Sequence, residues 1–89
     1  MNKTIIASLI HRDSETKVLS LVGHFDVSKF DVREDALEHV FEVTQNIEKP
    51  WSSEGHRSTS VNDVIVINDG DTRAVYCVAG IGFDFIQNL

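Results

Sequence analysis

The sequence predicts an α+β fold, in which one helix packs on a small antiparallel sheet of four or five strands. Two pairs of short apolar runs, each pair joined by a polar turn, indicate two β-hairpins. Between the pairs lies one segment whose apolar residues recur at helical spacing. The expected order is therefore β-β-α-β-β, with a further strand near the end of the chain, and the helix must cover one face of the strands.

The first hairpin is expected from residues 4–10 and 17–25, which are apolar runs separated by the polar stretch 11–16. In the second run, apolar side chains at positions 18, 19, 21, 22 and 25 leave little polar surface on either face. Such a pattern is typical of a strand that is covered on at least part of both sides.

The helix is expected from residue 32 to residue 48. One of its faces carries Leu37, Val40, Phe41, Thr44 and Ile47. These positions follow the three-and-four spacing of an amphipathic helix. Asp31 followed by Glu34 resembles a capping box at the start, and Pro50 disfavours helical backbone at Lys49 and sets the end.

The second hairpin is expected from residues 63–67 and 72–79, because the turn between them contains the Asp-Gly pair 69–70. Glycines at 80 and 82 permit a bend. The apolar residues of the segment 83–86 then predict a short closing strand or an apolar tail docked on the core.

Length and composition predict one domain spanning residues 1–89, since 89 residues with 42% apolar content build a single core. The N-terminal apolar stretch lacks a cleavage site, and no segment approaches the roughly 20 apolar residues of a membrane helix. The one cysteine, Cys77, excludes an internal disulfide. We therefore expect a cytoplasmic protein without a membrane contact.

The chain is acidic, with a net charge of −6 that opposes general attraction to nucleic-acid phosphates. Residues 26–48 hold seven acids against two bases, so this segment carries −5 of the excess. Nucleic acid is therefore a less favoured partner than a protein.

The residue pattern does not favour an enzyme. The four histidines lie 13, 15 and 17 residues apart, which matches no short metal-ligand spacing, so we expect neither a metal nor a cofactor. Cys77 stands in the middle of a predicted strand rather than at a helix N-terminus, where a thiol is activated.

Two surfaces are candidates for binding. The first is the acidic row of the helix, where three glutamates four residues apart and a neighbouring aspartate offer carboxylates to a basic groove. Its residues are Glu34, Asp35, Glu38 and Glu42. The alternative interpretation is an ordinary solvated helix face.

The second surface is the loop 49–60, which lacks apolar periodicity and is long for a compact domain. Trp51, His56 and Arg57 combine aromatic area with hydrogen-bond donors, as binding hot spots do. Trp51 can equally fold back onto the end of the helix and join the core.

The run Arg57-Ser-Thr-Ser-Val-Asn-Asp-Val-Ile-Val-Ile67, followed by Gly70, Tyr76 and Gly82-Phe83, resembles the signature of the YodL-like family. The resemblance covers about the last 35 residues. It implies a small accessory protein of phages or mobile elements, and no common catalytic activity. The residues also have a structural interpretation, in which Ser58, Ser60 and Asp63 accept hydrogen bonds from backbone N–H groups at a strand entry.

These observations together predict a small protein of phage or mobile-element type in the host cytoplasm. It would bind a host protein or protein complex and inhibit or modulate it, as an anti-defence factor does. The alternative is a nucleic-acid-binding domain that acts through the loop 52–60. Unpaired edge strands also suggest a homodimer.

Overall fold

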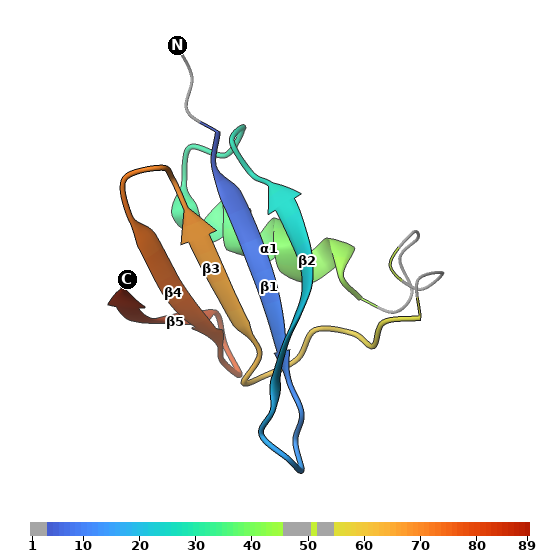
Figure 1. The fold of residues 1–89 in the computed structure, drawn as a ribbon. Helices are drawn as coiled ribbons and strands as arrows, with labels where there is room; N and C mark the ends of the chain where they lie inside the picture. The colour runs from blue at the N-terminus through green and yellow to red at the C-terminus, as the bar shows by residue number, and fades with distance from the viewer. Residues whose placement is uncertain (1–3, 46–50, 52–54) are drawn as a thin grey trace.

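The computed structural model describes residues 4–45, 51 and 55–89 (Figure 1). Its elements are β1 (Ile6–Arg12), β2 (Leu19–Asp26), α1 (Arg33–Val43), β3 (Val64–Asn68), β4 (Arg73–Val78) and β5 (Phe83–Asn88). The strands form one antiparallel sheet in the order β2-β1-β3-β4-β5. The predicted α+β class, both hairpins and the closing strand are confirmed.

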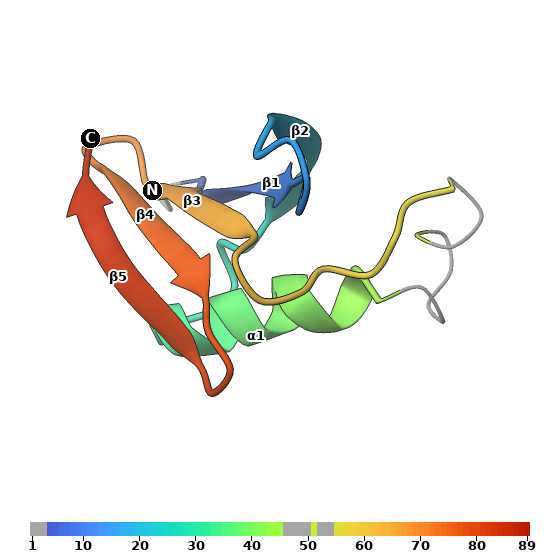
Figure 2. The same cartoon turned by 90° about the horizontal axis from the view of Figure 1, so that it is seen from below.

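The sheet is joined at its middle by the pairing of β1 with β3, in which Leu9 lies opposite Ile65 and Ala7 opposite Ile67. These four side chains are buried and point to the same face, since paired residues of antiparallel strands share a face. Helix α1 lies across that face (Figure 2). It contributes Leu37 and Val40 to the core.

The helix is shorter than predicted and begins differently. It ends at Val43, because the backbone of Thr44 leaves the helical conformation and the Thr44 carbonyl accepts a hydrogen bond from the N–H of Thr59. The expected end at residue 48 was therefore wrong, and residues 46–50 lie outside the described part of the chain. The capping box was also wrong: Val32 is the N-cap, and no side chain caps it.

Strand β2 lies at an edge of the sheet, and its prediction as a strand covered on at least part of both sides was wrong. Leu19 and Leu21 are more than half exposed, as is Val18 just before the strand. The helix packs over the middle of the sheet, so only Val22 and Phe25 of β2 reach the core. Apolar composition cannot tell an edge strand from a central one.

Candidate functional site

The acidic row lies on the outer face of α1, where Glu34, Asp35, Glu38 and Glu42 are all exposed. The face borders the turn between β4 and β5, and a Cβ atom placed on Gly82 of that turn would lie 3.7 Å from Glu34 Oε1. The predicted carboxylates therefore do not stand on an isolated helix. Two of them, Glu38 and Glu42, line one side of a groove.

This groove, which we call the acidic groove, has a volume of about 230 Å³. It is lined by Glu38, Phe41, Glu42, Val78, Ala79, Gly80, Gly82 and Phe83. The rings of Phe41 and Phe83 meet edge to face with centroids 6.5 Å apart. The floor is therefore apolar, and two carboxylates stand on the helix side.

The turn beside the acidic groove exposes one large apolar side chain almost completely. Ile81 is 97% exposed, between Gly80 and Gly82, and Gly82 adopts a positive φ of 72°. The turn is closed by a hydrogen bond from the N–H of Ala79 to the carbonyl of Gly82, at 3.1 Å. Sequence reasoning missed Ile81, although an isoleucine between two glycines in a turn was a usable signal.

On the second predicted surface, the structure decides between the two interpretations of Trp51. The structure brings Trp51, His56 and Arg57 together, but the Trp51 indole is only 4% exposed. Its Nε1 donates a hydrogen bond to the carbonyl of Arg57 at 2.8 Å, and the ring of His56 stacks on it with centroids 4.3 Å apart. The indole therefore belongs to the core. The exposed surface of this segment is formed by other residues, among them Arg57.

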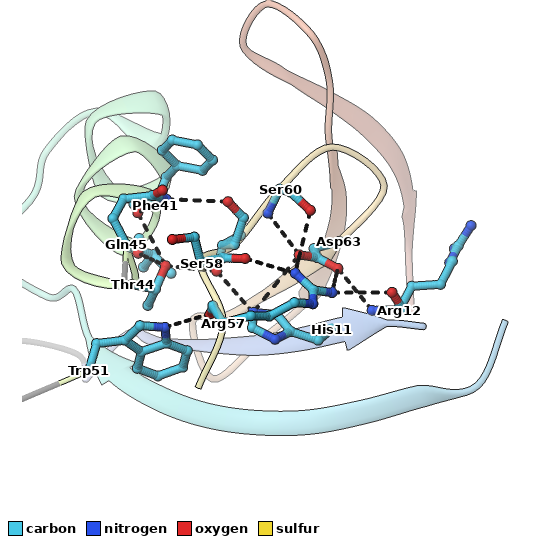
Figure 3. Close-up of polar contacts among 12 residues, drawn as sticks. His11, Arg12, Phe41, Thr44, Gln45, Trp51, Arg57, Ser58, Ser60 and Asp63 are labelled. Atoms are coloured by element: carbon cyan, nitrogen blue, oxygen red, sulfur yellow. Dashed lines mark hydrogen bonds and ion pairs between the residues drawn. The ribbon is translucent and has the colours of Figure 1, made fainter. Parts of the chain in front are cut away.

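Asp63 is the centre of a polar network that ties this segment to the sheet (Figure 3). Its carboxylate is 1% exposed and accepts two hydrogen bonds from the Arg57 guanidinium, both at 2.8 Å. The backbone N–H groups of Arg12 and Ser60 donate to the same carboxylate at 2.9 and 2.8 Å. The predicted role of Asp63 at the strand entry is confirmed.

Burial by itself would raise the pKa of Asp63, but the hydrogen bonds from Arg57, Arg12 and Ser60 outweigh it and hold the pKa below the usual value. Asp63 is therefore charged at neutral pH. The guanidinium of Arg57 also donates to the carbonyls of Ser58 and Arg12, at 2.8 and 3.2 Å. Arg57 is thus largely committed to this internal network.

Sequence reasoning missed His11, which is buried beside the network. Its Nε2 lies 3.0 Å from Thr59 Oγ1, which accepts a hydrogen bond from the hydroxyl of Thr44 at 2.8 Å. A histidine next to a hydroxyl is the arrangement of an activated nucleophile. Here, however, the Thr59 side chain is buried where a substrate cannot reach it. The contacts instead fix the segment 55–60 against the end of α1.

Loss of solvation on burial lowers the pKa of His11 below 6.5, although the carboxylate of Asp63 opposes this shift. The unfolded chain then binds a proton at a higher pH than the folded chain does. The contribution of His11 to the free energy of unfolding is fully present above pH 6.5 and is lost as the pH falls toward the folded-state pKa.

We expect urea unfolding between pH 7.5 and about pH 5 to show a falling free energy of unfolding, with a slope of up to about 1.4 kcal/mol per pH unit from His11. His11→Gln should flatten the profile in this range. His39→Gln, which removes a histidine outside the network, serves as the matched control and should keep the slope. An unchanged slope in His11→Gln would contradict this account.

Comparison with protein-family models, with curated proteins and with solved structures finds no match for the chain. The resemblance to the YodL-like family therefore stays a prediction. In the described residues, no group of three or more histidine, cysteine, aspartate or glutamate side chains is arranged to hold a metal ion. No helix in the same part of the chain is long and apolar enough to cross a membrane.

The loop predicted for the nucleic-acid alternative borders a hollow of about 270 Å³. Arg12, Lys17 and Arg57 line it. Arg57 directs its guanidinium to Asp63, and Lys17 Nζ donates to the carbonyl of Ser14 at 2.9 Å. Contacts within the chain thus engage two of these three cations. The hollow is therefore a weaker candidate binding site than the acidic groove. Residues 52–54 of the loop lie outside the described part of the chain.

Proposed function

We propose that the protein is a binding module that holds a cationic, partly apolar segment of a partner protein in the acidic groove. The observation that carries the proposal is the apolar floor of Phe41 and Phe83 beside the carboxylates of Glu38 and Glu42. Arginine and lysine place an aliphatic stem on apolar surface while the charged head reaches a polar rim. The groove offers both surfaces to one such side chain.

Two further features support this binding mode. Ile81 is a large exposed apolar side chain next to the groove, which gives a partner a hydrophobic contact beside the ionic one. The exposed carboxylates also attract a cationic partner over a distance and raise its association rate.

The resemblance of the segment 57–83 supports a wider role, that of an accessory protein of a phage or mobile element which inhibits or modulates a host macromolecule. Host proteins that process nucleic acids carry basic surfaces for phosphate. An acidic groove suits such a surface and would compete with nucleic acid for it.

The test is a double charge reversal, Glu38→Lys with Glu42→Lys. The two positions are four residues apart, so one like-charged pair replaces another and the helix keeps nearly the same stability. The probe is a short synthetic peptide rich in arginine and leucine, and its affinity is measured by calorimetry. We expect the dissociation constant to rise at least about tenfold in the reversed variant. The affinity of the unmodified protein should fall with added salt.

The matched control is Glu15→Lys with Asp71→Lys, which changes the net charge equally but in the two hairpin turns. This variant should keep most of the affinity. If both double variants lose affinity to the same extent, the peptide responds only to net charge and the acidic groove is not the site.

A further inference from the structure

The face of the sheet turned away from α1 has an apolar centre. Paired residues share a face, and the pairs Ile10 with Val64, Val64 with Cys77 and Val66 with Val75 all lie opposite the helix. We call this surface the far face; its apolar members are Ile6, Ile10, Leu19, Leu21, Val64, Val66, Val75 and Cys77. They are half-buried, except that Leu19 and Leu21 on the edge strand are 54% and 58% exposed.

The central strand β3 is apolar on both of its faces. A sheet with one solvated face alternates apolar and polar side chains along each strand. Residues 64–67 of β3 are Val-Ile-Val-Ile, with Ile65 and Ile67 buried under the helix and both valines on the far face. A strand that is apolar on both faces is typical of a sheet that is covered on both sides.

Two polar side chains of the far face suit burial. Ser8 and His24, which lie opposite each other on it, form a hydrogen bond of 2.8 Å. Each therefore already has a partner, which lowers the cost of removing it from water.

The charges of the far face are compatible with a second copy of the chain as its partner. It carries Arg12, Asp26, Arg73 and Asp84, two of each sign, so it is neutral although the chain carries −6. The exposed carboxylates of α1 lie on the other side of the sheet. Two copies can therefore bring their far faces together without the repulsion that their net charge would cause elsewhere.

The size of the far face fits a weak dimer. Five strands spaced about 4.8 Å apart, each of about six residues, give a flat area of about 500 Å² per copy. A pair would bury at most about 1,000 Å², which lies in the range of weak, transient interfaces. Two sheets of this kind pack face to face, and their side chains interdigitate.

We propose that a second copy of this chain covers the far face, so that two sheets form a sandwich with both α1 helices and both acidic grooves on the outside. Val66 of the central strand lies near the middle of the interface. A symmetric pair uses the same patch twice, so each substitution acts on both sides.

The test is Val66→Lys, with the oligomeric state followed by sedimentation equilibrium from micromolar to millimolar protein. We expect the unmodified chain to dimerise in this range, and the variant to have a dissociation constant at least about 100-fold higher, because two ammonium groups would be buried. Ile81→Lys, the same kind of change on the helical side, should leave dimerisation intact. Val66→Lys should in turn bind the arginine-rich peptide normally, which separates this proposal from the proposed function.

Cys77 gives a second measurement on the unmodified chain. It is the one cysteine of the chain and lies on the far face, next to Val64. The rate constant for alkylation of Cys77 by a maleimide should fall as the protein concentration rises. The rate constant for free cysteine at the same concentrations serves as the control and should fall less. A chain that stays monomeric to millimolar concentration, or a dimer that Val66→Lys does not weaken, would overturn the proposal. The second outcome would point to pairing through a strand edge.

Discussion

Replacing Asp63 with asparagine is expected to lower the free energy of unfolding by about 3 to 5 kcal/mol. The carboxylate is buried and accepts hydrogen bonds from Arg57 and from the N–H groups of Arg12 and Ser60. Asparagine has one acceptor oxygen, and its amide group would face a donor. A chain of this length has a total stability of about 4 to 13 kcal/mol, so the loss would be a large fraction of it.

Chemical denaturation followed by circular dichroism measures the effect. Asp84→Asn, the same change at an exposed carboxylate of β5, should stay within about 0.5 kcal/mol of the unmodified protein. Arg57→Ala should cost less than Asp63→Asn, about 1.5 to 3 kcal/mol, because the half-exposed guanidinium is partly solvated and Asp63 keeps its backbone donors. In the double variant the two losses should not add. Additive losses would contradict a coupled pair.

The predictable part of the fold was the part governed by local rules. The Asp-Gly turn and the apolar runs around it predicted the hairpin of β3 and β4, and the spacing of Leu37 and Val40 predicted the buried face of α1. The end of the helix was not predictable, since Thr59, fifteen residues further along, occupies the carbonyl of Thr44. Contacts between distant segments leave no periodic signal.

In the candidate site too, the features set by local sequence were predictable and those set by distant contacts were not. The row of Glu34, Glu38 and Glu42 could be read from the helical period, because exposure follows from the apolar face opposite. The groove could not, because its floor needs Phe83 to pack against Phe41 across the fold. The far face was likewise hidden, since it appears only when the register of five strands is known.

Trp51 decides between the two interpretations of the loop that the sequence left open. If the Trp51 side chain were a surface contact, its truncation to alanine would leave the free energy of unfolding nearly unchanged. In the structure the indole packs between Phe25 and His56, with ring centroids 6.1 and 4.3 Å away, and its N–H is bonded to the carbonyl of Arg57. Trp51→Ala is therefore expected to lower the free energy of unfolding by about 3 to 5 kcal/mol.

Circular dichroism is the suitable measurement, because Trp51 is the one tryptophan of the chain and the variants lose its fluorescence. Trp51→Phe is the matched control: it keeps an aromatic ring but loses the hydrogen bond to Arg57, so its loss should be clearly smaller than that of Trp51→Ala. A core residue acts on partner binding only through the stability of the fold. If Trp51→Ala instead weakens peptide binding while the unfolding curve stays in place, the indole contacts the partner and the loop belongs to the binding surface.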